Sequence, residues 1–274
     1  MTRASRLSIV ARRAPGEKYP VDHATAEIER DDTRRNAFTL WLDGVESSHV
    51  DLDDPTYLVF EYMQWFGAVI DCLRPARAPI DTVHVGGAAA TLARFIAATR
   101  PQSRQTVFEV DAALVELVRE KLPLPKSRRL RVRVADARLG LAALPTSSAD
   151  LVVRDAFLDA EVPPHLRTVE FTLLVKEILR PGGVYMANVA DGVPYRKLGP
   201  EVAAVAEAFT ELVVISEPAV LRGRRHGNLV VLASDAPLPV EAIAARVASG
   251  AAPARVRAGG EARAMARGHR PPRD

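Results

Sequence analysis

One stretch of the chain, residues 81–95, has the pattern of a strand, a tight turn and a helix. Val83 and Val85 are β-branched and alternate with polar neighbours, and Gly86 and Gly87 then interrupt the strand before a run of good helix formers. Glycines let the backbone turn sharply and let a ligand come close to it, and the first helical turn offers unpaired N–H groups. The stretch therefore predicts a βα unit that can bind a ligand at its turn, although many such turns contain two glycines and bind nothing.

Acidic residues stand at the ends of the strands that follow. Glu109 lies near the end of the strand predicted over 106–111, and Asp136 and Asp155 end two further strands. An acid about 20 residues after a glycine turn is the residue type that binds ribose hydroxyls. Ligands of open α/β sheets lie beyond the carboxyl ends of the strands, so the three acids are candidate site residues. The structural alternative for Asp155 is a cap on the loop that follows it.

Composition narrows the function classes. The net charge is +3 and aromatic residues are 5% of the 274, with none in the basic C-terminal segment, which disfavours nucleic-acid binding. Cys72 is the single cysteine, so an internal disulfide and a cysteine zinc cluster are excluded, and we expect no metal.

No apolar run approaches the ~20 residues of a membrane helix, and we expect a cytoplasmic protein. His165 and His226 have no neighbour at ligand spacing and are expected to be solvated.

The chain divides into four predicted segments. They are a flexible N-terminus (1–22), a β-hairpin domain (23–54), an α/β domain (55–249) and a disordered basic tail (250–274). Asp43-Gly44 is a strong hairpin signal. Asp54-Pro55 predicts a helix start that leads to a helix ending near residue 73. The last two β-rich segments are expected to close the sheet as an antiparallel pair.

These motifs together resemble one protein family. In chain order they are Leu42-Asp43-Gly44-Val45 in a hairpin, Tyr57 and Glu61 in a helix, Val85-Gly86-Gly87, Glu109-Val110-Asp111, Asp136-Ala137-Arg138, Asp155 and Leu179-Arg180-Pro181-Gly182-Gly183. Over roughly residues 24–233 the arrangement resembles the spermidine synthase family of polyamine aminopropyltransferases. Its second half is shared with class I S-adenosylmethionine-dependent methyltransferases, whereas the Leu-Asp-Gly hairpin is more specific.

The resemblance implies a fold and an assembly. The fold class is α/β, a seven-stranded methyltransferase-like (Rossmann-like) doubly wound sheet with a small N-terminal antiparallel β domain. The implied assembly is a homodimer that acts on a small-molecule amine. Composition gives no reason to expect nucleic acid or a membrane as a partner.

The resemblance also implies roles for single residues. Glu109 would hold the ribose hydroxyls, Asp136 and Ala137 would face the adenine, and Gly86 and Gly87 would pass under the nucleoside. Asp155 would lie near the attacking amine, where a carboxylate can bind the cation and take its proton. The substrate-binding candidates are Glu61, Tyr57 and Asp159, with Glu161 as the alternative to Asp159 for anchoring the far amine.

The chain also departs from the family pattern. The family loop Gly-Gly-Gly-Asp-Gly is here Gly86-Gly87-Ala88-Ala89-Ala90, so its acid is missing. The hairpin has Glu46-Ser47-Ser48 where the family has a glutamine, and the second acid after Asp155 comes one place late. Three hypotheses stay open: aminopropyl transfer from decarboxylated S-adenosylmethionine to an amine, methyl transfer from S-adenosylmethionine, and a catalytically lapsed nucleoside-binding homologue.

Overall fold

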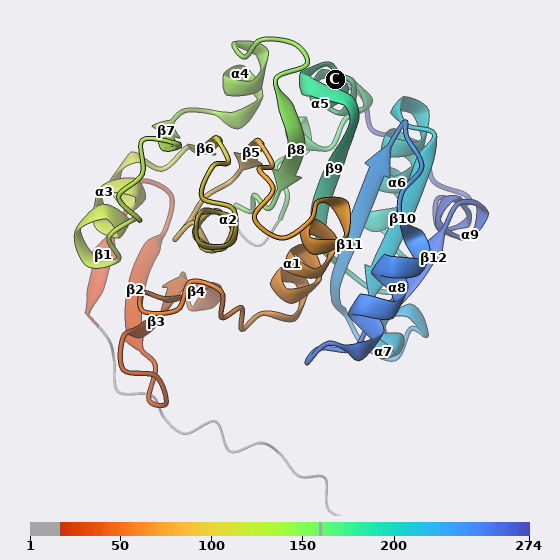
Figure 1. The fold of residues 1–274 in the computed structure, drawn as a ribbon. Coiled ribbons are helices and arrows are strands. Elements are labelled where there is room, and N and C mark those ends of the chain that lie inside the picture. Colours follow the sequence, from red (N-terminus) through yellow and green to blue (C-terminus); the bar gives the residue numbers. More distant parts are fainter. Residues whose placement is uncertain (1–16, 159–160) are drawn as a thin grey trace, which may run out of the picture.

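The computed structural model describes residues 17–158 and 161–274, and over these ranges the chain forms two sheets (Figure 1). The smaller sheet is antiparallel with the order β1-β2-β3-β4, and the larger is mixed with the order β12-β10-β11-β9-β8-β5-β6-β7. Most of the predicted flexible N-terminus, residues 1–16, lies outside the described residues. The remainder of that segment contains the short strand β1, Lys18–Pro20.

The smaller sheet packs its apolar face against the larger unit. Its other strands are β2 (Thr25–Arg30), β3 (Ala37–Leu42) and β4 (Val45–Asp51). Asp43 and Gly44 join β3 to β4 with positive φ angles of 48° and 79°, as the hairpin signal predicts. Ala26, Leu40 and Val50 are buried in one apolar cluster with residues of helix α3 (Ala112–Lys121). This packing fixes the hairpin beside the larger sheet.

Helices cover both faces of the larger sheet. Its strands are β5 (Thr82–Val85), β6 (Gln105–Glu109), β7 (Leu130–Val134), β8 (Ala149–Arg154), β9 (Leu179–Asp191), β10 (Glu211–Ser216), β11 (Gly227–Ser234) and β12 (Arg255–Ala258). The other helices are α1 (Glu61–Leu73), α2 (Thr91–Thr99), α4 (Ala137–Ala142), the 3-10 turn η1 (Pro164–Leu166), α5 (Val169–Ile178), α6 (Leu198–Ala208), α7 (Pro218–Leu221), α8 (Val240–Ser249) and α9 (Gly260–Ala264).

Alternation along the strands sorts the core into two layers. Val152 of β8 belongs to the cluster that contains α5 and α6 side chains such as Phe171 and Val202. Its neighbours Leu151 and Val153 belong to the opposite cluster, which contains side chains of α1, α2 and α8. Successive side chains of a strand point to opposite faces, so strands buried on both sides read as continuous apolar runs. The predicted doubly wound α/β fold is confirmed (Figure 1).

The C-terminal end of the chain corrects two expectations. Residues 250–274, predicted to be disordered, contain β12 and α9, and β12 pairs antiparallel with β10 as an eighth strand where seven were expected. Ala254 and Ala262 are fully buried, and Arg263 donates to the carbonyl oxygens of Phe209 and Thr210. The Ala-, Arg-, Gly- and Pro-rich composition of the segment predicts disorder. The segment is ordered instead because two buried alanines and the hydrogen bonds of one arginine attach it to the rest of the fold.

Two further elements differ in detail from the sequence predictions. Strand β11 pairs antiparallel with both β9 and β10, so it lies inside the sheet rather than at its end. Helix α1 begins at Glu61 and not at Pro55, because the Asp54 carboxylate accepts hydrogen bonds from Thr56 and closes a turn. No helix within residues 17–158 and 161–274 combines the length and apolarity that crossing a bilayer requires.

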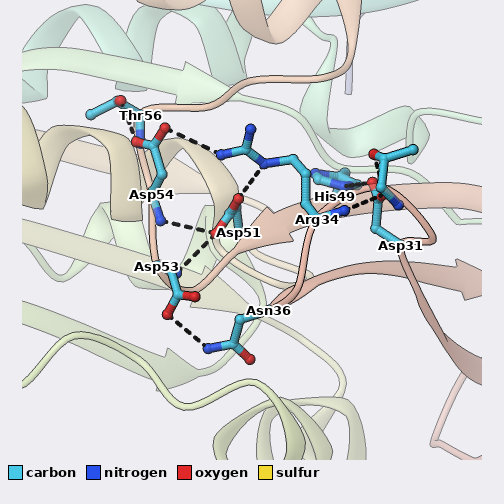
Figure 2. Close-up of polar contacts among 9 residues, drawn as sticks. Asp31, Arg34, Asn36, His49, Asp51, Asp53, Asp54 and Thr56 are labelled. Carbon is cyan, nitrogen blue, oxygen red and sulfur yellow. Dashed lines mark hydrogen bonds and ion pairs between the residues drawn. The ribbon is translucent and has the colours of Figure 1, made fainter.

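A buried carboxylate anchors the end of the small sheet. The Asp51 Oδ1 atom accepts the N–H groups of Asp53 and Asp54, and its Oδ2 atom accepts from Arg34 Nε at 2.5 Å (Figure 2). Burial alone would raise the pKa of Asp51, but these donors and the Arg34 charge outweigh it and lower the pKa below its ordinary value. The connection from β4 toward α1 therefore leaves the sheet in one fixed direction.

We predict that Asp51→Ala lowers the free energy of unfolding by about 2–3 kcal/mol, since it leaves charge-assisted hydrogen bonds without their acceptor. Chemical denaturation measures this, with Asp53→Ala at an exposed neighbouring acid as the control. The pKa of Asp51 is lower in the folded protein than its ordinary value of 3.8. The stabilising contribution of Asp51 is therefore present above pH 3.8 and disappears as the pH falls through the folded pKa. Equal losses for the two variants at neutral pH would contradict this role.

Candidate functional site

A cavity of about 1000 Å³ opens at the carboxyl ends of the central strands, next to the small sheet. Most of the predicted site residues line it: Gly86, Gly87, Glu109, Asp136, Ala137, Asp155 and Glu61. Asp43 and Ser48 of the β3–β4 hairpin line the same cavity. Segments far apart in the sequence therefore meet at one site, with carboxylates at several places on its wall.

The two glycines of the β5–α2 turn are required by close packing. Gly86 has a φ of +90°, and a Cβ atom there would lie 2.5 Å from the carbonyl oxygen of Asp155. At Gly87 a Cβ atom would lie 2.7 Å from Val107 Cγ1. Any larger residue would push the turn away from β8 or β6. The turn thus sits directly against the strand ends that carry Glu109 and Asp155.

The Glu109 carboxylate is held by backbone donors. Its Oε2 atom accepts the N–H groups of Gly87 and Ala88, both at 2.9 Å, and its Oε1 atom accepts the N–H of Asp111 at 3.2 Å. An ionised carboxylate has about four acceptor positions, so Oε1 keeps one for a ligand. Glu109 is therefore oriented before any ligand binds.

The alanines that follow the glycines occupy an unusual backbone conformation. Ala88 and Ala90 have φ angles of 40° and 58°, a region that costs a residue with a Cβ atom about 1–2 kcal/mol. The small sheet braces this loop, because the Ala89 N–H donates to Ser48 Oγ and Thr91 Oγ1 donates to the His49 carbonyl oxygen. Ala89 itself is fully buried in the apolar cluster against that sheet.

One wall of the cavity is formed by Asp136 and His165. The Asp136 Oδ1 atom accepts the Leu139 N–H and caps α4, and its Oδ2 atom lies 2.8 Å from His165 Nε2. Burial favours a higher pKa for Asp136, but the Leu139 and His165 contacts prevail and lower it. His165 is solvated as expected, with a side chain 43% exposed, but the fold also brings it a partner 29 residues away in the sequence that its neighbours did not predict.

Asp155 contacts two polar side chains in the cavity wall. Tyr62 OH and Asn188 Nδ2 each donate to one of its carboxylate oxygens at 3.0 Å. Desolvation raises the pKa of Asp155 against the opposing effects of Asn188, Tyr62 and Arg154. Burial and the Asp155 charge raise the pKa of Tyr62 well above its ordinary value, so the Tyr62 hydroxyl stays protonated as a donor.

Asn188 is a site residue that the sequence reasoning missed. It is 2% exposed, lines the cavity, and among the described residues its Oδ1 atom has no hydrogen-bond partner. Because Nδ2 donates to Asp155, the amide orientation leaves Oδ1 as an acceptor for a ligand N–H. The available signal was one polar residue inside the apolar strand run 184–189.

The predicted amine-binding residues are not brought together. Tyr57 does not line the cavity; its ring lies 3.9 Å from the Arg34 guanidinium carbon and edge-on to His49. The late start of α1 explains this, because Tyr57 lies in the irregular segment before the helix. Asp159 lies outside the described residues. Of the three, Glu61 alone is placed at the cavity by the described structure, and no cluster of metal-ligating side chains is present in residues 17–158 and 161–274.

We predict that Ala88→Gly raises the free energy of unfolding by about 0.5–1 kcal/mol, because glycine relieves the positive φ while adding some unfolded-state entropy. Ala97→Gly, at a half-buried position inside α2, should instead lower it by about 1 kcal/mol. Urea denaturation of both variants measures the difference. Equal destabilisation by the two substitutions would show that the Ala88 backbone is not strained.

Sequence comparisons give partial matches to named enzymes. No family model matches the chain. The polyamine aminopropyltransferase of Vibrio vulnificus is 28% identical over 141 residues, which are 51% of this chain and 45% of that protein. The probable polyamine aminopropyl transferase of Bifidobacterium longum is 31% identical over 111 residues, which are 39% of this chain and 24% of that protein. The chain thus matches less than half the length of these curated relatives.

Structural comparisons cover between 66% and 96% of the chain. Spermidine synthase in complex with the transition-state analogue AdoDATO shares 17% identity at a TM-score of 0.63, over 85% of this chain and 78% of that one. Human methyltransferase-like protein 13 in complex with SAH shares 23% sequence identity at a TM-score of 0.54, over 66% of this chain and 85% of that one. These two show the fold. A probable spermidine synthase from Corynebacterium glutamicum is 33% identical over 96% of this chain and 97% of that chain, with a TM-score of 0.87. With that match, the chain belongs to the spermidine synthase family.

Proposed function

We propose that the protein binds decarboxylated S-adenosylmethionine and transfers its aminopropyl group to a small-molecule amine. The observation that carries this proposal is one cavity with a preorganised carboxylate, Glu109, on one wall and the Asp155–Asn188 pair on another. Both curated relatives are named aminopropyltransferases, which favours this reaction over methyl transfer. The proposal includes a cytoplasmic homodimer that uses no metal.

The nucleoside would bind along the strand ends. The free acceptor position of Glu109 Oε1 suits a ribose hydroxyl, which donates a charge-assisted hydrogen bond. The adenine would lie against Ala137 and Leu166, which line the cavity beside the Asp136–His165 pair. Gly86 and Gly87 leave room for the ribose and sulfonium to approach the backbone.

The reaction is an in-line displacement. The amine lone pair attacks the propyl carbon bonded to the sulfonium, the carbon–sulfur bond breaks, and its electrons neutralise the sulfur to give methylthioadenosine. An amine attacks only in its neutral form, so the acceptor ammonium first gives a proton to Asp155, the candidate base because its desolvated carboxylate has a raised pKa, and the product amine keeps its own proton. Tyr62 and Asn188 orient that carboxylate, and Asn188 Oδ1 can accept an N–H from the amine. Holding amine and sulfonium in line supplies much of the rate.

We predict that Asp155→Asn lowers the turnover of decarboxylated S-adenosylmethionine by about 10²–10⁴, the usual range for losing a general base. The loss should shrink at higher pH, where more of the amine is already neutral. Chromatographic measurement of released methylthioadenosine checks both effects across a pH series. A variant as fast as the wild type would make Asp155 structural and refute the mechanism.

Stability provides the control for this variant. Because the pKa of Asp155 is raised in the folded protein, the protonated carboxyl stabilises the fold relative to the ionised one. This contribution is fully present below the ordinary pKa of 3.8 and is lost as the pH rises through the folded value. At neutral pH the uncharged amide side chain of Asp155→Asn does not lose it, so the free energy of unfolding of the variant should equal or exceed that of the wild type. A large destabilisation would mean that the lost turnover reports misfolding.

A further inference from the structure

The residue directly before Asp155 is a buried arginine. Arg154 is the last residue of β8, and its side chain is 0% exposed. Successive side chains of a strand point to opposite faces, so Arg154 lies with Val152 on the side of the sheet that α5 and α6 cover. Asp155 lies on the opposite side, where it faces the cavity and Tyr62 of α1. A buried cation and the candidate base therefore share one strand end.

Arg154 is held by partners from two other elements. Its Nη2 atom forms an ion pair with the Glu201 carboxylate of α6, and its Nε atom donates to Tyr185 OH of β9 at 3.1 Å. Burial opposes the charge of Arg154, but Glu201 and Tyr185 outweigh it and raise the pKa of Arg154, so the guanidinium stays cationic. The charge of Arg167, in the turn before α5, also acts on Glu201.

Stability alone gives no reason for these buried charges. Apolar residues of similar volume are often at least as stable as a buried ion pair. The pairing is also incomplete, because within residues 17–158 and 161–274 the buried Nη1 atom of Arg154 has no hydrogen-bond partner. A guanidinium that is kept in the interior under these conditions points to a role beyond packing.

The groups that act on the Asp155 carboxylate, within the part of the chain that the structure describes, are two uncharged donors and one cation. Tyr62 of α1 and Asn188 of β9 donate to the two carboxylate oxygens. Desolvation raises the pKa of Asp155, and Asn188, Tyr62 and the Arg154 charge oppose that rise. A charge in the interior acts over several ångströms because water does not screen it there. The Arg154 charge therefore favours the ionised form of Asp155 from behind the strand.

We propose that the buried Arg154–Glu201 pair is a positioning element for the base: the Arg154 guanidinium stabilises the ionised Asp155 carboxylate across β8, and Glu201 limits this effect by balancing the charge. This inference rests on the proposed aminopropyl transfer, in which Asp155 must be ionised to accept a proton. Arg154 lies behind the strand and not in the cavity wall, so it acts through Asp155. The two charges of the pair act on the base in opposite directions, which a purely structural role would not produce.

Two variants test this opposition in the pH profile of kcat/KM for 1,4-diaminobutane at saturating decarboxylated S-adenosylmethionine. Arg154→Met/Glu201→Leu removes the cation without leaving a buried unpaired acid, and the low-pH limb of the profile should move up by about one pH unit. Glu201→Gln keeps the size of the side chain but leaves the Arg154 charge unbalanced, so the limb should move down by about half a unit. Glu207→Gln, at a 41% exposed acid of the same helix, should leave the limb unchanged.

Carbon-13 NMR of the aspartate side-chain carboxyl groups measures the same ionisation without turnover. The Asp155 resonance is identified by its absence from Asp155→Asn, and its titration midpoint is compared between the wild type and the two variants. If no protein releases methylthioadenosine but the midpoints move in opposite directions, aminopropyl transfer is refuted and the role of Arg154 stands.

Midpoints that move in the same direction, or that stay at the wild-type value, overturn the role of Arg154. If methylthioadenosine is released in that case, the transfer reaction stands without it. Should Glu201→Gln fail to fold, the double variant still decides, because its midpoint must rise above that of the wild type.

Discussion

The three backbone N–H groups that converge on the Glu109 carboxylate hold the functional end of this molecule together. They tie the turn after β5 to the end of β6, and thereby fix where α2 starts. The absence of a side chain at Gly86 lets the same turn touch the Asp155 carbonyl oxygen at the end of β8. One short loop therefore sets the relative positions of Glu109 and Asp155, the two acids on which the proposed chemistry depends.

The small sheet supports this loop from the other side. Ser48 and His49 of β4 bond to the loop and to the first residue of α2, and Ala89 is buried between the two parts. The missing family acid is thus explained in structural terms, because the Ala89 side chain packs into an apolar interface. The positive φ angles of Ala88 and Ala90 show that the loop keeps the glycine-type backbone without the glycines.

Local signals in the sequence predicted the parts of the fold that depend on neighbouring residues. The Gly86-Gly87 turn, the Asp43-Gly44 hairpin and the acids at the strand ends all lie where the pattern places them. The sequence pattern did not predict contacts between segments that are far apart in the chain. His165 acquires its Asp136 partner and Asn188 its Asp155 partner only through the folded sheet, and β12 forms only because β10 offers it an edge. Tyr57 was misplaced because Asp54 closes a turn that looks like a helix start.

The central claim is that Glu109 organises a nucleoside site, and calorimetric titration of methylthioadenosine into the wild type and Glu109→Gln tests it most directly. The variant keeps the size of the side chain but removes the charge, and a charge-assisted hydrogen bond is worth about 1.5–3 kcal/mol. Glu116→Gln, at an exposed acid of α3, serves as the control. We expect the wild type to bind methylthioadenosine in roughly the micromolar range, and this affinity to weaken about tenfold or more in Glu109→Gln alone. Unchanged affinity in Glu109→Gln, with the fold intact, would contradict it.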